Sequence, residues 1–206
     1  MSRFWSIDSP IMSGLGTLAD MILLNIVYII CCLPVITIGA STTALYTVTL
    51  KMVRKEYPAV LKSFFKAFRK NFKHSTLCWI PAALTGLLLL VDLRIMGLIE
   101  GAGRTVLLAL LGIVLVVYIM VMTYLFPYIA RFENTIRQTF KNVLLISIAH
   151  LPATLLMAGI TIALAVLVFF SARTFVLATI VGFFFGFAAL AYLKSLLLTR
   201  IFKKHE

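Results

Sequence analysis

The chain alternates between long runs without a charged residue and short basic segments. Five runs are uncharged when His150 is counted as neutral: Met21–Leu50 with 30 residues, Ser75–Val91 with 17, Thr105–Ala130 with 26, Asn142–Ala172 with 31 and Thr174–Leu193 with 20. A helix of about 20 apolar residues crosses the hydrocarbon core of a bilayer. The pattern predicts an all-α, polytopic transmembrane helical bundle that forms one membrane domain, 1–206, with about five spans near residues 18–40, 75–93, 105–130, 143–171 and 174–196.

The first run is longer than one straight span needs, and it contains its own break. Pro34 lacks a backbone N–H, and Gly39 tolerates dihedral angles that other residues avoid. We expect a kinked or unwound section here, with the alternative that residues 21–50 form a re-entrant hairpin. Hydroxyl groups at such a kink usually hydrogen-bond to their own backbone. The expected helix-break motif comprises Pro34, Gly39, Ser41, Thr42, Thr43 and Tyr46.

A basic amphipathic segment, 51–74, follows this motif. Its apolar side chains recur at helical spacing, at Leu61, Phe64, Phe65, Phe68 and Phe72, and its basic side chains lie on the other side, at Lys62, Lys66, Arg69, Lys70 and Lys73. Such a pattern is typical of a helix lying at the membrane interface. The same pattern fits a helix that packs on its own bundle and exposes its basic face to water. The basic side chains are candidates for contact with the membrane surface or a partner.

Part of this segment recurs later in the chain. Arg69-x-x-Phe72-Lys73-x-x-x-Leu77 is repeated as Arg137-x-x-Phe140-Lys141-x-x-x-Leu145, each time at the start of a span. Any basic helix that enters a membrane has this appearance, and we favour that explanation over an internal repeat. Arg137 and Lys141 join the candidates for surface or partner contact.

The Lys and Arg residues predict the orientation of the spans. Fifteen of them lie in the three segments 51–73, 131–141 and 194–204, whereas four, Arg3, Arg94, Arg104 and Arg173, lie on the other side. Cytoplasmic loops carry the excess of basic residues. We therefore expect the amino terminus outside and the carboxyl terminus in the cytoplasm. If residues 21–50 re-enter instead, both termini lie inside and four spans remain.

Composition supports a membrane protein and excludes several other classes. Of the 206 residues, 62% are hydrophobic, far above the share of roughly 45–50% in soluble domains. The formal net charge of +12 is placed between membrane-length runs, which favours the lipid surface over nucleic acid. The three cysteines, Cys31, Cys32 and Cys78, lie in apolar stretches without CxxC spacing. They predict no metal site and no disulfide framework.

Two polar side chains lie inside predicted spans. Asn25 is one turn from Tyr28, and we interpret it as a hydrogen-bonding contact between helices rather than a substrate ligand. His150 precedes Pro152 by two residues, and we interpret it as structural, because a proline frees a carbonyl one turn back. The sequence has no phosphate-binding glycine loop, no HExxH and no paired intramembrane carboxylates. We expect no catalytic residues, no cofactor and no enzyme activity.

The sequence resembles a known family in three blocks. They are LADMILLNIVYIICCLPVITIGASTTALYTVTLKMVRKE, SFFKAFRKNFK and FPYIARFENTIRQTFKNVLLISIAHLP. Together they resemble the YesL family of bacterial membrane proteins, and LPVITIGASTTALY is the most specific block. The resemblance implies about five helices and a plasma-membrane location in Gram-positive bacteria. The molecular function of the family is unknown.

The resemblance also implies a setting. Members of the family are commonly encoded near carbohydrate ABC importers, which is an association rather than a mechanism. We expect a non-enzymatic accessory subunit or partner of such an importer, in contact with the lipid bilayer and with a permease or ATPase subunit. The alternatives are a small transporter or channel in its own right, and a membrane scaffold or sensor.

Overall fold

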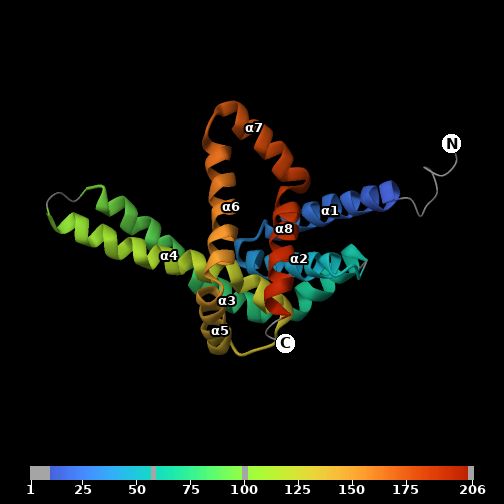
Figure 1. The fold of residues 1–206 in the computed structure, drawn as a ribbon, viewed down its shortest axis with the longest axis horizontal. Coiled ribbons are helices and arrows are strands. Elements are labelled where there is room, and N and C mark those ends of the chain that lie inside the picture. Colours follow the sequence, from blue (N-terminus) through green and yellow to red (C-terminus); the bar gives the residue numbers. More distant parts are fainter. Residues whose placement is uncertain (1–9, 57–58, 99–101, 204–206) are drawn as a thin grey trace.

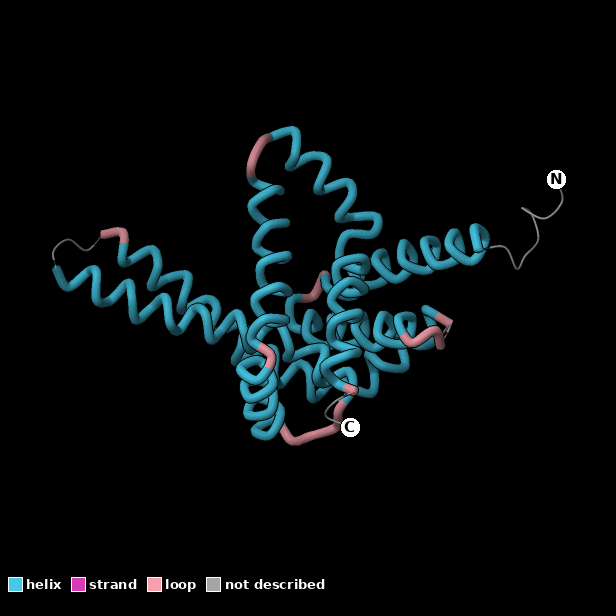
Figure 2. The backbone as a smooth tube through the Cα atoms, in the orientation of Figure 1, coloured by secondary structure: helices cyan, strands magenta, loops and turns pink. Residues whose placement is uncertain are grey.

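Every element of the described chain is a helix. A computed structural model describes residues 10–56, 59–98 and 102–203, and Figure 2 shows its helices joined by short loops. The elements are α1 (Pro10–Cys32), the short 3-10 helix η1 (Val35–Thr37), α2 (Ile38–Val53), α3 (Val60–Met96), α4 (Ala102–Arg131), α5 (Ile136–Ala149), α6 (Leu151–Phe169), α7 (Ala172–Val181), the π-helix η2 (Gly182–Gly186) and α8 (Phe187–Phe202). The all-α fold class is confirmed.

Five helical stretches are long and apolar enough to cross a membrane, as predicted. They are Leu15–Cys32, Val60–Met96, Gly103–Arg131, Leu151–Val168 and Arg173–Phe202. The last of these runs through α7, η2 and α8. The chain is therefore a multi-pass membrane protein, with its stretches close to the predicted spans.

The limits of two predicted spans differ in the structure. The first predicted span, 18–40, stops early, since α1 ends at Cys32, just before Pro34. The fourth, 143–171, is divided, because α5 ends at Ala149 and α6 begins at Leu151. In both places a proline that cannot donate an N–H lies within two residues of the break.

The basic amphipathic segment is not a separate interfacial helix. Residues 60–74 form the first part of α3, which continues without interruption to Met96. At the junction between the basic segment and the span the continuity has a physical reason, since the chain from Val60 to Ile80 contains no glycine or proline to end the helix. Farther along, α3 also continues through Pro81. Phe64 is completely buried and Phe68 is half-buried, whereas Leu61, Phe65 and Phe72 are exposed. Packing within the bundle therefore accounts for only part of the apolar face.

Helix α2 lies at the centre of the fold. It is too short to span a bilayer, and ten of its sixteen residues are buried. The hydroxyl oxygens of Thr43 and Ser75 lie 2.8 Å apart and join α2 to α3. Those of Thr49 and Ser195 lie 2.9 Å apart and join α2 to α8.

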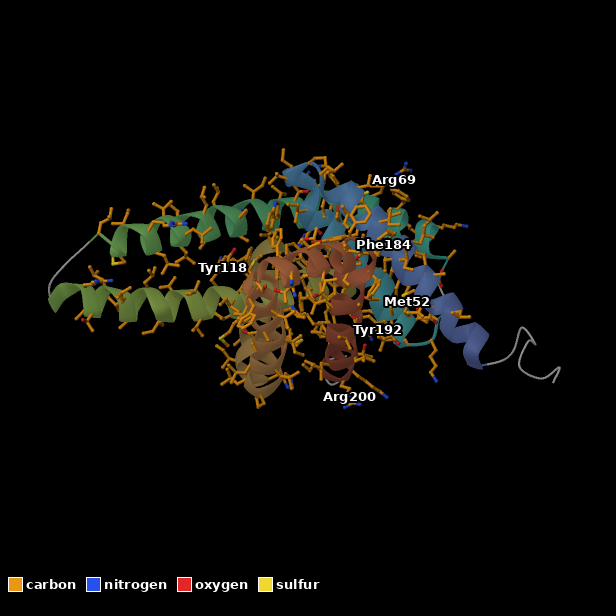
Figure 3. All side chains as sticks on the ribbon, turned by 90° about the horizontal axis from the view of Figure 1, so that it is seen from above. Met52, Arg69, Tyr118, Phe184, Tyr192 and Arg200 are labelled. Carbon is orange, nitrogen blue, oxygen red and sulfur yellow. The ribbon has the colours of Figure 1, made fainter. Side chains whose placement is uncertain are left out.

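The helices leave this centre in different directions. Figures 1 and 3 show that α1 and α2 run in opposite directions, so the amino-terminal end of α1 and the α2–α3 connection lie on the same side of the molecule. The distal parts of α3 and α4 form one projecting hairpin, and α6 and α7 form another (Figure 1). In the first hairpin the Tyr118 hydroxyl donates to the Ala82 carbonyl across 3.2 Å.

Gly39 provides a test of the contact between α2 and α3. A Cβ atom at this position would lie 2.6 Å from the Cβ of Trp79 and 2.7 Å from the carbonyl oxygen of Ser75. We predict that Gly39→Ala forces the helices apart and lowers the free energy of unfolding by about 1–3 kcal/mol. Thermal unfolding in detergent, followed by circular dichroism, measures the effect.

The matched control for this variant is Gly112→Ala on α4. No atom lies within 4 Å of the added Cβ there, and alanine is a better helix former than glycine. Its unfolding temperature should be unchanged or higher. Equal unfolding temperatures for the two variants would contradict the close approach of α2 to α3.

Candidate functional site

The helix-break motif uses its polar groups to satisfy backbone atoms. At the end of α1, the Cys31 carbonyl accepts hydrogen bonds from Thr37 Oγ1 at 2.6 Å and from Ser41 Oγ at 3.0 Å. The indole Nε1 of Trp79 donates to the Val35 carbonyl at 2.8 Å. A helix end in an apolar environment needs such partners because no water can supply them.

The remaining members of the motif lie inside α2. Thr42 Oγ1 donates to the Ile38 carbonyl at 2.7 Å, and Thr43 Oγ1 donates to the Gly39 carbonyl at 3.0 Å. Tyr46 is buried, whereas Pro34 is exposed at the turn. The unwound section, expected from Pro34 to Ser41, is therefore shorter, because α2 already begins at Ile38. The arrangement is that of a packed helix start and presents no open ligand site.

Asn25 stabilises the π-helix in the last span. Its Nδ2 donates to the Gly182 carbonyl at 3.0 Å and to the Phe183 carbonyl at 2.7 Å, and its Oδ1 accepts from the Ala188 N–H at 2.9 Å. The side chain is completely buried. One amide thus satisfies three backbone groups that the wide turn displaces from the α-helical pattern. Figure 3 shows Phe184, in the middle of this turn, beside α1.

His150 lies between α5 and α6, at the break before Pro152. The hydroxyl Oγ1 of Thr154 donates to the Ser147 carbonyl at 2.9 Å and to the His150 carbonyl at 3.0 Å. It also lies 3.2 Å from the hydroxyl of Tyr124. Sequence reasoning singled out His150 at this break but missed Thr154, which is almost completely buried. A threonine two residues after a proline was the available signal, since its hydroxyl can reach back one turn.

Basic side chains from three helices line a hollow of about 300 Å³. Lys51 comes from the last turn of α2, Lys66 and Lys70 come from α3, and Arg131 is the last residue of α4. We call this site the basic hollow. Its lining residues are Thr47, Lys51, Ser63, Lys66, Ala67, Lys70, Asn71, Ile129, Ala130, Arg131 and Glu133.

The charge of the basic hollow is strongly positive, with four cationic side chains and one carboxylate. That carboxylate, Glu133, forms an exposed ion pair with Lys70. The hydrogen bond and the charge of Lys70 lower the pKa of the Glu133 carboxyl, so Glu133 is ionised at neutral pH. A smaller hollow of about 230 Å³ shares Lys51 and Arg131 and adds Arg54. The site can therefore bind an anion.

The predicted surface residues separate into two groups. Lys66 and Lys70 line the basic hollow, whereas Lys62, Arg69 and Lys73 are exposed on α3 and do not line it. Figure 3 shows Arg69 pointing away from the bundle. Arg137 and Lys141 are exposed on α5 and also lie outside the hollow.

Sequence reasoning missed two cations of the basic hollow, Lys51 and Arg131. Both entered the charge count, but Lys51 lies on α2 and Arg131 ends α4, whereas Lys66 lies on α3. Spacing within one helix cannot bring side chains of different helices together. Their positions at the ends of uncharged runs were the only signal.

A larger hollow of about 700 Å³ lies between α6 and the continuous stretch formed by α7, η2 and α8. Its lining is apolar apart from the hydroxyls of Thr174 and Thr179, and both hydroxyls donate to carbonyls of their own helix, at Ser171 and Phe175. Within the described part of the chain, no group of three or more His, Cys, Asp or Glu residues could hold a metal ion.

Comparison with known proteins identifies relatives but no characterised activity. Residues 21–93 match a family model described as "Protein of unknown function, DUF624". The chain is 28% identical to the uncharacterized protein YesL of Bacillus subtilis (strain 168) over 185 residues, which cover 89% of this chain and 82% of YesL. It is 29% identical to the uncharacterized protein YteU of the same organism over 137 residues, or 64% of this chain and 60% of YteU. No solved structure matches the chain.

Asn25 provides a test of the hydrogen bonds at the π-helix. Leucine has the same number of side-chain heavy atoms, branched at the same carbon, but no polar group, so Asn25→Leu leaves the Ala188 N–H and two carbonyls without their partner. We predict a loss of about 1–3 kcal/mol in the free energy of unfolding, measured by thermal unfolding in detergent.

Thr161→Val is the control for Asn25→Leu. The Thr161 hydroxyl donates to the carbonyl of Met157, one turn earlier in its own helix, and that carbonyl keeps its place in the helical pattern without it. An effect of Asn25→Leu no larger than that of Thr161→Val would show that the three hydrogen bonds do not hold α1 against the last span.

Proposed function

Because the resemblance to the YesL family is confirmed, we propose that the chain is a non-enzymatic plasma-membrane subunit that works as the accessory partner of a carbohydrate ABC importer. The observation that carries this proposal is the distribution of its chemistry. Polar side chains inside the bundle bond to backbone groups or to one another, as Asn25 and the Thr43–Ser75 pair do. The charged side chains lie between or beyond the uncharged runs and most of those described are exposed, with the buried Lys194 on α8 as an exception. The family's association with importer genes supplies the kind of partner.

The projecting hairpins supply surfaces for a membrane partner. Along the outer half of α3, Leu88 and Leu90 are 64% and 62% exposed, and Ile113 on the facing helix α4 is 63% exposed. Lipid or another membrane helix must cover such side chains, because water cannot solvate them favourably. The two hairpins diverge (Figure 1), and a permease helix of similar polarity fits between or against them.

The apolar hollow beside α6 argues against a separate transporter or channel. A sugar pathway needs polar groups that replace the water lost by the hydroxyls of the sugar. The two threonine hydroxyls of this hollow are already bonded to backbone carbonyls. An accessory role therefore fits the structure better than the transporter alternative.

The direction of α1 supports a topology with both termini in the cytoplasm. Since α2 runs back along α1 (Figure 1), the amino-terminal end of α1 lies on the same side as the basic α2–α3 connection. In this topology α1 and α2 form a re-entrant hairpin, and α3, α4, α6 and the α7–α8 stretch are the four crossings. Arg3 then joins the basic residues inside, leaving Arg94, Arg104 and Arg173 outside, which strengthens the positive-inside bias.

Thiol labelling in intact cells tests this topology. In a variant without Cys31, Cys32 and Cys78, we predict that Ser6→Cys is protected from a membrane-impermeant reagent and becomes labelled after the cells are permeabilised. Arg173→Cys serves as the outside control and should be labelled without permeabilisation. Labelling of Ser6→Cys in intact cells would place the amino terminus outside.

Affinity purification tests the proposed partnership. The tagged chain, extracted in a mild detergent, should retain a carbohydrate permease or its ATPase at a constant ratio, and a deletion strain should take up oligosaccharide more slowly. Recovery of neither subunit, together with unchanged uptake in the deletion strain, would contradict the proposal.

A further inference from the structure

We propose that the basic hollow is a binding site for the phosphate group of an anionic phospholipid. This inference goes beyond the accessory role and does not depend on an importer partner. It rests on the side chains that line the hollow and on the position of its cations relative to the ends of the apolar stretches.

The side chains of the hollow match the chemistry of a phosphate group. Lys51 and Lys66 provide ammonium groups from two different helices, and Arg131 provides a planar guanidinium that suits two phosphate oxygens. The Ser63 hydroxyl and the Asn71 amide add neutral hydrogen-bonding groups to the same lining. The volume of about 300 Å³ holds a phosphodiester with part of its headgroup.

The carboxylate of the hollow does not oppose this binding strongly. Glu133 is paired with Lys70, and its side chain is 75% exposed, so water screens its charge. With four cationic side chains and one carboxylate in its lining, the hollow keeps an excess of positive charge.

The height of the hollow favours a lipid over a soluble anion. Arg131 ends the apolar stretch Gly103–Arg131, and Lys51 follows directly on the uncharged run Met21–Leu50. Lys66 precedes the uncharged run of α3 at Ser75 by nine residues, which is about 13 Å of helix. Lys51 and Arg131 therefore lie where lipid phosphates lie, just beyond the hydrocarbon. Lys66 lies farther out along α3, and its long side chain lines the same hollow.

The lining also changes polarity in the direction that a lipid requires. Ile129 and Ala130 form the apolar part of the hollow, one turn or less from Arg131. A lipid that places its phosphate between Lys51, Lys66 and Arg131 can lay its glycerol and first methylene groups against these residues. Free phosphate would leave that apolar surface uncovered.

Native mass spectrometry of the full chain tests the inference. The protein is placed in nanodiscs containing equal amounts of phosphatidylglycerol and phosphatidylcholine, and the lipids that remain bound after release are counted. We predict that the wild type keeps phosphatidylglycerol in preference. Lys51→Gln/Lys66→Gln should reduce that retention on the order of tenfold, because each of the two ammonium groups contributes a charge-assisted hydrogen bond to the phosphate inside the hollow.

Lys62→Gln/Lys73→Gln is the matched control. It removes the same number of positive charges at exposed positions of α3, the helix that carries Lys66, and neither position lines the hollow. This variant should retain phosphatidylglycerol as the wild type does. Equal losses in the two double variants would show that net charge alone attracts the lipid and would overturn the site. Should Lys51→Gln/Lys66→Gln unfold, Lys66→Gln against Lys62→Gln makes the same comparison.

A competition arm separates the lipid from a soluble anion. Millimolar inorganic phosphate, added before release, should leave the bound phosphatidylglycerol unchanged, since it cannot cover the apolar part of the hollow. Displacement of the lipid by inorganic phosphate would assign the hollow to a soluble phosphate compound and overturn the lipid assignment.

Discussion

The fold depends on one constraint: a backbone group that leaves the helical pattern inside an apolar medium must find another partner within the protein. The described chain leaves the α-helical pattern at several places within or beside its apolar stretches, and a polar side chain serves each of the following three. Ser41 and Thr37 bond to the end of α1, Thr154 bonds across the α5–α6 break, and Asn25 bonds to the π-helix. Bonding to backbone groups thus gives these polar side chains a structural role inside apolar surroundings.

The same constraint makes α2 the centre of the molecule. A sixteen-residue helix with small and hydroxyl-bearing residues can approach its neighbours closely, as Gly39 does at α3. Its hydroxyls then bond to α3 and α8. The preceding helix, α1, runs in the opposite direction to α2 (Figure 1). One consequence is that the amino-terminal end of α1 lies on the same side as the α2–α3 connection (Figure 1). Another is the basic hollow, which forms where the end of α2 meets α3 and the end of α4.

Sequence patterns predicted the helices better than their arrangement. The five apolar stretches follow from run length, because the bilayer sets a minimum that a sequence must meet. The break near Pro34 follows from the chemistry of proline. The meeting of Lys51, Lys66 and Arg131 could not be predicted, because it depends on how α2 and α4 end against α3. Helical spacing placed Lys66 and Lys73 on one basic face, whereas only Lys66 lines the hollow. Thr154 escaped notice because His150 is the more unusual residue in a span.

The central claim is that α2 is buried between α3 and α8, and a cysteine pair tests it most directly. The hydroxyl oxygens of Thr49 and Ser195 are 2.9 Å apart, although 146 residues separate them in the sequence, and two cysteines in these places are close enough for a disulfide. In native membranes of a variant without Cys31, Cys32 and Cys78, Thr49→Cys/Ser195→Cys should cross-link with a membrane-permeant oxidant, and Thr47→Cys/Ser195→Cys should not. Equal cross-linking of both pairs, or none in the first, would contradict the account.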